Sequence, residues 1–184
     1  MRPLAHFITI TKHRRLVRKY CFRLGLFRQG LTHDLSKYSP AEFLPGARYY
    51  TGDSSPNFSE RRKNGLGYSE AWLHHKGRNK HHFDYWQDYC LQPDGSFVYG
   101  PCKMPIRYVA EMFCDRLAAN RIYQGEDYND AAPLEYFLRT RANLPMHPDS
   151  CAEIEKMLLV LRDEGEEAAF RYVKKRLREE KDGA

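Results

Sequence analysis

Apolar residues recur at helical spacing through most of the 184-residue chain, and few stretches alternate apolar and polar positions as strands do. The clearest case is the segment from residue 3 to about residue 26, where basic side chains fall largely outside one apolar stripe. That stripe consists of Phe7, Ile10, Leu16, Val17, Tyr20 and Leu24. The pattern predicts a long basic helix here and an all-α fold for the chain as a whole.

The next stretch, residues 31–52, is predicted to contain two helices. A short helix is expected over residues 31–37. Ser39 then precedes Pro40, with Glu42 at the capping-box position, so a helix should begin there and end near Gly52. Residues 51–67 are rich in glycine, serine and basic side chains and are expected to form a mobile surface loop.

Helices are also predicted over residues 68–75, 83–90 and 105–123. Between the last two, Gln92–Pro101 has the composition of turns and is expected to form at most a short hairpin. Beyond Pro133 the pattern predicts three more helical segments. A second capping box, Ser150 with Glu153, should open the middle one.

Composition narrows the class of protein. With 42% hydrophobic and 29% charged residues, the chain is typical of a soluble globular protein. No apolar run approaches the roughly 18 residues of a membrane span, and the N-terminus lacks a secretory pattern, so a cytoplasmic protein without a membrane partner is expected. The net charge of +6 favours anionic ligands. Five widely spaced cysteines without a C-x-x-C pair are expected to be reduced and mostly buried.

Three features carry chemistry. His33 and Asp34 are adjacent, and four of the eight histidines lie within nine positions. These four are His74, His75, His81 and His82. Asp115 shares the apolar face of its predicted helix, where an unpaired charge would cost several kcal/mol, and His13 points inward by the same spacing argument. Imidazole and carboxylate together are ligands for manganese, iron, cobalt or zinc.

Helix geometry limits which histidines of this cluster can reach the same site. On one straight helix His75 and His82 would stand about 10.5 Å apart along the axis, so both can reach a compact site only if the helix breaks. Gly77, followed by Asn79, offers such a break. His75 and His82 are the preferred ligands, then His81, with His74 last.

In order along the chain, His13, the His33-Asp34 pair, the histidine cluster and Asp115 resemble the signature of the HD-domain superfamily of metal-dependent phosphohydrolases. Leu31-Thr32-His33-Asp34-Leu35-Ser36-Lys37 is similar to that family's paired motif, and Cys114-Asp115-Arg116-Leu117 to its closing motif. The segment from His74 to His82 also resembles an uncharacterised HD-like family of small bacterial and phage proteins. The resemblance covers roughly residues 5–125.

The resemblance implies an HD-like helical bundle with a metal site in its core, formed by residues 1–125. The helical segments of residues 126–184 are expected to form a C-terminal extension packed on the same domain. The resemblance also implies that His13, His33, Asp34 and Asp115 hold one ion. Asp34 would bridge to a second ion held with His75, His81 and His82. The expected cofactor is therefore two divalent ions, manganese or iron before zinc, cobalt or magnesium.

Five residues are candidates for catalysis or substrate binding. Asp34 and Lys37 are the expected catalytic residues, and Lys37, one turn beyond the pair, is placed to contact a phosphate. Arg78, Asn79 and Lys80, in the turn between the histidines, are candidate substrate-binding residues, although a polar turn needs no function.

The sequence leaves three functions open. The first is a hydrolase acting on a nucleotide or related phosphate ester through metal-activated water. The second is an HD-fold di-iron oxygenase. The third is a basic adaptor or nucleic-acid-binding module with a structural metal, suggested by Arg14, Arg15, Arg18 and Lys19. Motifs of P-loop, zincin, serine-hydrolase and dinucleotide-binding proteins are absent from the sequence. A homodimer remains open.

Overall fold

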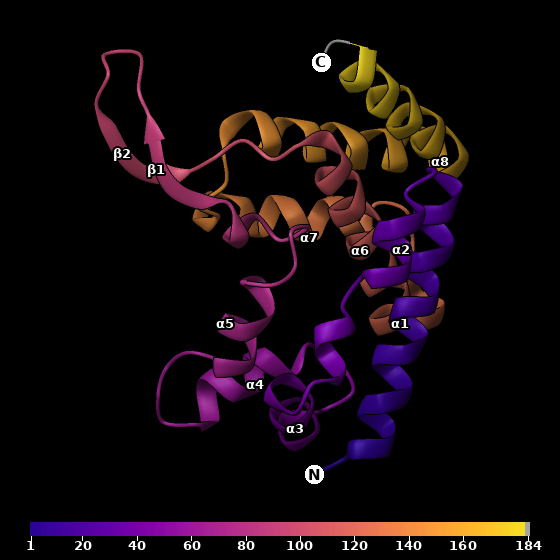
Figure 1. Ribbon diagram of the computed structural model, residues 1–184. Coiled ribbons are helices and arrows are strands. Elements are labelled where there is room, and N and C mark those ends of the chain that lie inside the picture. Colours follow the sequence, from indigo (N-terminus) through magenta and orange to yellow (C-terminus); the bar gives the residue numbers. More distant parts are fainter. Residues whose placement is uncertain (183–184) are drawn as a thin grey trace.

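The computed structural model describes residues 1–182, which are mostly helical, with 70% of residues in helices and a small two-stranded sheet (Figure 1). Eight α-helices occur in this range. They are α1 (Pro3–Arg23), α2 (Phe27–Thr32), α3 (Pro40–Tyr49), α4 (Pro56–Lys63), α5 (Glu70–Lys76), α6 (Ile106–Gln124), α7 (Ala132–Thr140) and α8 (Pro148–Asp182). The strands are β1 (Gln87–Leu91) and β2 (Phe97–Pro101). The predominantly helical prediction is therefore confirmed.

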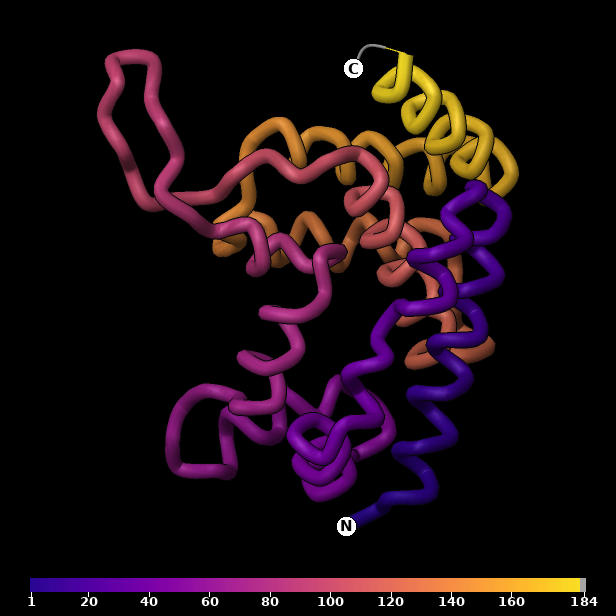
Figure 2. The backbone as a smooth tube through the Cα atoms, in the orientation of Figure 1, coloured from indigo at the N-terminus to yellow at the C-terminus, as the bar shows by residue number. Residues whose placement is uncertain are grey.

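The helices form two groups that α1 connects. In Figure 1, α3, α4 and α5 gather near the N-terminus, whereas α6, α7 and α8 form the other end of the molecule. Helix α1 runs along the side of both groups, and the tube in Figure 2 shows the β1–β2 hairpin extending away from the helices. The ligand candidates lie on segments from both groups, so the packing of α1 against α3 and α6 determines their separation.

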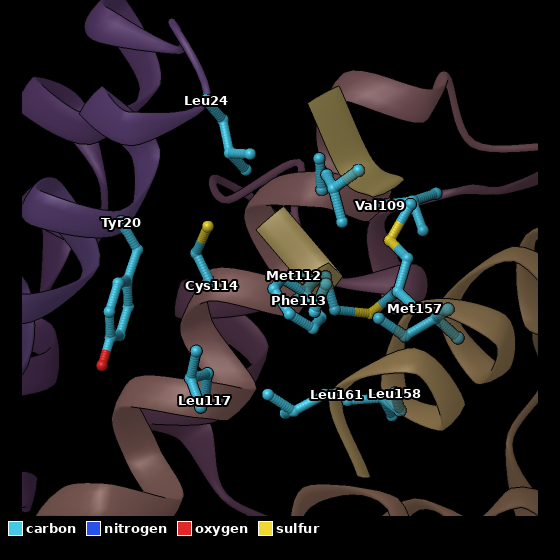
Figure 3. Close-up of a cluster of buried hydrophobic side chains, with 14 of the residues drawn as sticks. Tyr20, Leu24, Val109, Met112, Phe113, Cys114, Leu117, Met157, Leu158 and Leu161 are labelled. Carbon is cyan, nitrogen blue, oxygen red and sulfur yellow. The ribbon is translucent and has the colours of Figure 1, made fainter. Parts of the chain in front are cut away.

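The hydrophobic core lies between α1, α6, α7 and α8 (Figure 3). Tyr20 of α1, Phe113 and Leu117 of α6, and Met157 and Leu161 of α8 are at most 2% exposed. Burying side chains of this size stabilises the fold by about 1.5 to 3 kcal/mol each. Residues before and after position 125 thus contribute to the same core.

Helix α4 corrects one prediction. Residues 51–67 were expected to be a loop, but Pro56–Lys63 is helical. The buried Glu60 explains the difference, because its carboxylate accepts hydrogen bonds from the Ser69 hydroxyl and from the Glu70 backbone N–H, 3.2 Å away. This contact with the start of α5 is long-range information that local composition does not contain.

The predicted helix over residues 83–90 is also wrong. Only a 3₁₀ turn, Phe83–Tyr85, forms there, and β1 follows it. Strand β1 pairs antiparallel with β2, and the rings of Tyr89 and Tyr99 meet edge to face across the pair, with centroids 5.3 Å apart. Gly95, with φ of 84°, makes the tight turn between them. The expected short hairpin is therefore present, and its pairing overrides the helical spacing of residues 83–90.

Two helix starts differ from expectation. Helix α3 begins at Pro40 as predicted, but the Ser39 side chain makes no capping hydrogen bond. Helix α8 begins at Pro148, so Ser150 lies inside it, where the Ser150 hydroxyl accepts a hydrogen bond from the Met104 N–H at 2.8 Å. Gly165, with φ of 82° and ψ of 175°, divides α8 into two helical segments.

Within residues 1–182, no helix combines the length and the hydrophobicity that crossing a membrane requires. Two cysteines, Cys21 and Cys114, are buried, whereas three others are half-buried, which corrects the expectation that most are buried. The half-buried cysteines are Cys90, Cys102 and Cys151.

Candidate metal centre

Four separate segments bring the candidate ligands together. His13 lies in α1 and Asp115 in α6, while His33 and Asp34 occupy the break between α2 and a 3₁₀ turn at Leu35–Tyr38. This break corrects the prediction of one helix over residues 31–37. The Arg14 guanidinium of α1 holds it in place by donating to the backbone oxygens of His33, at 2.7 Å, and Leu31, at 3.1 Å.

Asp34 has an unusual backbone conformation. Among residues 1–182 it is the one non-glycine residue with positive φ, at 53°. Left-handed conformations are uncommon outside glycine, although aspartate tolerates them better than most residues. This turn directs the side chain of Asp34, which is fully buried, between the ligand candidates.

The first group of ligand candidates contains His13, His33, Asp34 and Asp115. Asp115 Oδ1 lies 2.9 Å from His13 Nε2 and 3.4 Å from His33 Nε2. Asp34 Oδ2 lies 3.4 Å from His33 Nε2 and 3.8 Å from His13 Nε2. Two imidazoles and two carboxylates therefore face one small volume.

The second group contains Asp34, His75, His81 and His82. Helix α5 ends at Lys76, and a turn through Gly77 carries the chain back to the two later histidines. As a result, the Nε2 atoms of His75 and His82 are 2.9 Å apart. Asp34 Oδ1 is 3.3 Å from His75 Nε2 and 3.4 Å from His81 Nε2.

The two groups share Asp34 through different oxygen atoms. Oδ2 faces His13 and His33, whereas Oδ1 faces the later histidines. A carboxylate arranged in this way could bridge two cations. This is the central feature of the site.

The donor atoms fit metal ligation better than hydrogen bonding. The Nε2 atoms of His13, His33 and His81 and both oxygens of Asp34 are buried without a partner in hydrogen-bond geometry, although Lys37 Nζ forms an ion pair with Asp34 Oδ2 at 2.6 Å. Metal–ligand bonds of about 2.1 Å place neighbouring donors about 3.0 to 3.4 Å apart. Most of the separations above fall in that range. Buried groups of this kind could therefore hold a metal ion, and nothing in the geometry distinguishes one metal from another.

Glu111 contacts the Nδ1 atoms of two of the imidazoles and thereby orients their rings. Its Oε1 accepts a hydrogen bond from His33 Nδ1 at 2.9 Å and lies 3.2 Å from His81 Nδ1. Carboxylates that bind the Nδ1 of a histidine fix the tautomer that presents Nε2 to a metal. Glu111 thus supports one histidine of each group.

Glu42 has the same role on the other side. Its two oxygens accept hydrogen bonds from His75 Nδ1 at 2.7 Å and from His74 Nδ1 at 2.6 Å. The glutamate expected to cap α3 therefore orients His75 instead. His74 lies behind Glu42 and belongs to neither ligand group.

Opposite charges shift the ionisation of the site. Burial alone would lower the pKa of His33, but the charge of Asp34 and the contacts with Asp115 and Glu111 raise that pKa to about 10. Burial raises the pKa of Asp34, and the positive charges of His33 and Lys37 outweigh it and hold the pKa well below its usual value. The carboxylate is thus ionised, and a cation that binds His33 must displace the proton that this imidazole holds.

The remaining sequence candidates occupy different places. Lys37 Nζ lies 2.6 Å from Asp34 Oδ2, and its side chain is 31% exposed. Asn79 is buried, and its amide donates to the oxygen of His75 at 2.8 Å and to Ser36 Oγ at 2.9 Å, so it holds the turn and does not face solvent. Arg78 and Lys80 are exposed, and their role in substrate binding stays a prediction.

Sequence reasoning missed the two glutamates. Glu111 carried a detectable signal, because it lies one helical turn before Asp115 on the same apolar face of α6. Glu42 carried none that points to a metal site, since its position matches a capping box. Only the packing of α3 against α5 brings it to the histidines.

The chain belongs to a family of unknown function, DUF5662, whose model matches residues 2–160. The matched range includes all seven ligand candidates. No curated protein and no solved structure matches the chain significantly.

Proposed function

We propose that this protein is an HD-like, metal-dependent phosphohydrolase that acts on a phosphate ester, such as a nucleotide or a related small anion. The observation that carries the proposal is the position of Asp34, whose two oxygens face two different groups of histidines. The order of the motifs along the chain, His13, His33-Asp34, the histidine cluster and Asp115, supports the same assignment.

Two divalent ions, when bound, supply an activated water and positive charge for displacement at phosphorus. The protein's own residues hold and orient these ions. His13, His33 and Asp115 provide the first group of donors, and three later histidines, His75, His81 and His82, provide the second. Glu111 and Glu42 fix imidazole orientations, and the burial of Asp34 keeps bulk water from its oxygens.

Lys37 provides a positive charge beside the centre. Its ammonium group pairs with Asp34 Oδ2. The Lys37 side chain is 31% exposed, whereas His13, His33 and Asp34 are buried. A cation at the edge of the site can contact a phosphate oxygen while Asp34 is engaged with the ions. Asp34 and Lys37 are accordingly the proposed catalytic pair, one for the ions and one for the substrate.

The test is release of inorganic phosphate from a panel of nucleotides and simple phosphate esters. We expect activity that a chelator abolishes and that manganese or iron restores. Asp34→Asn should abolish it, whereas Asp163→Asn, which changes an exposed aspartate of α8, should leave it unchanged. Full metal loading without turnover of any phosphate ester would contradict the proposal.

Oxygen activation at a di-iron centre is a second candidate. The observation that favours it is the number of imidazoles, five across the two groups. Imidazole and carboxylate donors together suit iron. Iron in the purified protein together with oxygen consumption would favour this reaction. Manganese or magnesium dependence of phosphate release would favour hydrolysis.

A further inference from the structure

A small cavity adjoins the metal centre on the side of α3 and α5. Its volume is about 60 Å³. It opens between α1, α3, α5, α6 and the start of α4, and both Lys37 and His75 line it. One wall is therefore part of the proposed centre, and the opposite wall comes from other segments.

The walls of the cavity are suited to an anion. Lys37 contributes an ammonium group and Tyr123 a phenol. Ser55, Pro56 and Asn57, at the start of α4, line it too, and Ser55 makes no side-chain capping hydrogen bond to the helix. The N–H groups and the dipole at a helix start favour negative charge.

Glu42 is the one carboxylate among the lining residues. Both of its oxygens accept hydrogen bonds from histidines, His74 and His75, which reduces its repulsion of an anion. A second, independent observation concerns His6. It is only 6% exposed, lines the cavity, and its Nδ1 has no hydrogen-bond partner. A buried polar atom without a partner indicates a missing ligand or water.

The size of the cavity restricts the ligand. One water-sized occupant needs about 10 to 15 Å³, so the cavity has room for roughly four to six atoms of that size. A phosphate group has about that number of heavy atoms, whereas a nucleobase has more. Gly46 preserves this space, because a Cβ there would lie 2.3 Å from His6 Nε2 and would force the ring to move.

We propose that this cavity is a phosphate subsite that accepts one terminal phosphate group through Lys37, Tyr123 and the first turn of α4. The inference rests on the proposed function and specifies its substrate class, a phosphomonoester. The group esterified to the phosphate stays outside, so the identity of a nucleobase has little influence. A phosphodiester, substituted on both sides, does not fit.

The first experiment measures the affinity of inorganic phosphate for the manganese-loaded protein by calorimetry. We expect Tyr123→Phe to weaken binding about ten-fold, as loss of a hydrogen bond to a charged group does. Gly46→Ala should weaken it at least as much by displacing His6. The matched controls are Tyr99→Phe, at an exposed ring of the hairpin, and Gly100→Ala, where a Cβ meets no other atom.

Metal content and circular dichroism are measured for every variant, so that a folding defect is recognised. Unchanged phosphate affinity in a folded, metal-loaded Tyr123→Phe and Gly46→Ala would mean that the ions alone bind phosphate, and would overturn the subsite. The same conclusion follows if the wild-type protein does not bind phosphate.

The second experiment compares 4-nitrophenyl phosphate with bis(4-nitrophenyl) phosphate. We expect kcat/KM to favour the monoester at least about ten-fold, and equal or faster hydrolysis of the diester would overturn the assignment of substrate class. If neither of these esters nor any member of the nucleotide panel is hydrolysed, but phosphate binding responds to both variants, the proposed function fails while the subsite stands. The two failures are therefore distinguishable.

Discussion

The Nε2 atoms of His75 and His82 lie 2.9 Å apart, although seven positions separate the two residues. Helix α5 ends between them, so the second imidazole returns to the first. Two imidazole nitrogens at this distance must share either a proton or a cation. Burial of His82 and the charges of His81 and His75 hold the pKa of His82 well below its usual value, whereas the charge of Asp34 raises the pKa of His75 against the effect of burial, so without a cation the shared proton belongs to His75.

This arrangement predicts that the two ions can be removed separately. His82→Ala should lower the bound metal from two ions to about one per chain, because the first group remains intact. His13→Ala should have the same effect through the other group. Asp34→Asn should remove both ions, since its carboxylate is shared. Elemental analysis of the purified variants measures the stoichiometry.

Asp163→Asn is the control for these variants, because its carboxylate is exposed on α8 and belongs to neither ligand group. If Asp34→Asn kept two ions, or if His82→Ala and His13→Ala both lost all metal, the shared carboxylate would not be the link between two sites.

Glu111 should affect metal affinity without binding the metal. Glu111→Gln keeps the size of the side chain but removes the charge that holds His33 and His81 in their tautomers. We expect the dissociation constant for manganese to rise about 10- to 100-fold. Glu135→Gln, at an exposed position of α7, is the matched control. An unchanged dissociation constant would show that Glu111 is merely packed against the imidazoles.

His6 predicts a dependence of stability on pH. Burial and the positive charge of Lys37 lower the pKa of His6 from 6.5 to about 4. Between these values the unfolded chain binds a proton that the folded chain does not, so the free energy of unfolding falls as the pH falls from 6.5 to 4. After allowance for solvent screening, this contribution amounts to about 1 to 2 kcal/mol.

The measurement is urea unfolding of the wild type and of His6→Asn, in the presence of a chelator, at several pH values in that window. The difference in free energy between the two proteins should grow in favour of the wild type as the pH rises. A constant difference would mean that His6 titrates equally in both states.

Cys90 and Cys102 should form a disulfide on oxidation. Their Sγ atoms lie 2.6 Å apart, Cys90 in β1 and Cys102 directly after β2, and both residues are half-buried. With oxidised glutathione, one thiolate attacks the reagent and the second displaces glutathione, so the protein loses two electrons, two protons and about 2 Da. Peptide mass mapping identifies the pair. Oxidation confined to Cys151, with Cys90 and Cys102 still reduced, would contradict this prediction.

The sequence predicted the parts of the fold that depend on local pattern. The apolar stripe of α1 and the proline that begins α3 are sufficient to place those helices. The predictions for residues 56–63 and 87–91 were wrong because long-range contacts determine the structure of these segments. Buried contacts of Glu60 stabilise α4, and pairing with β2 stabilises β1, and neither is visible in a local window.

The ligand candidates of the site could be predicted because their residue combinations are rare. The glutamates that orient them could not, because glutamate is common in helices. An adjacent His33-Asp34 pair and clustered histidines are rare combinations, and the structure brings them together. Glutamates are common in helices, so Glu42 and Glu111 acquire meaning only through the imidazoles that contact them. The left-handed backbone conformation of Asp34, which turns its two carboxylate oxygens toward different ligand groups, cannot be predicted from residue type or spacing.

The central claim, two cations joined by Asp34, is tested most directly by anomalous diffraction from crystals of the protein as purified or soaked with manganese. Two anomalous peaks should flank the Asp34 carboxylate at about 3.5 to 4 Å from each other, one beside His13, the other beside His82. Absence of anomalous density at Asp34 in manganese-soaked crystals, with the imidazoles bonded only to one another and to carboxylates, would contradict it.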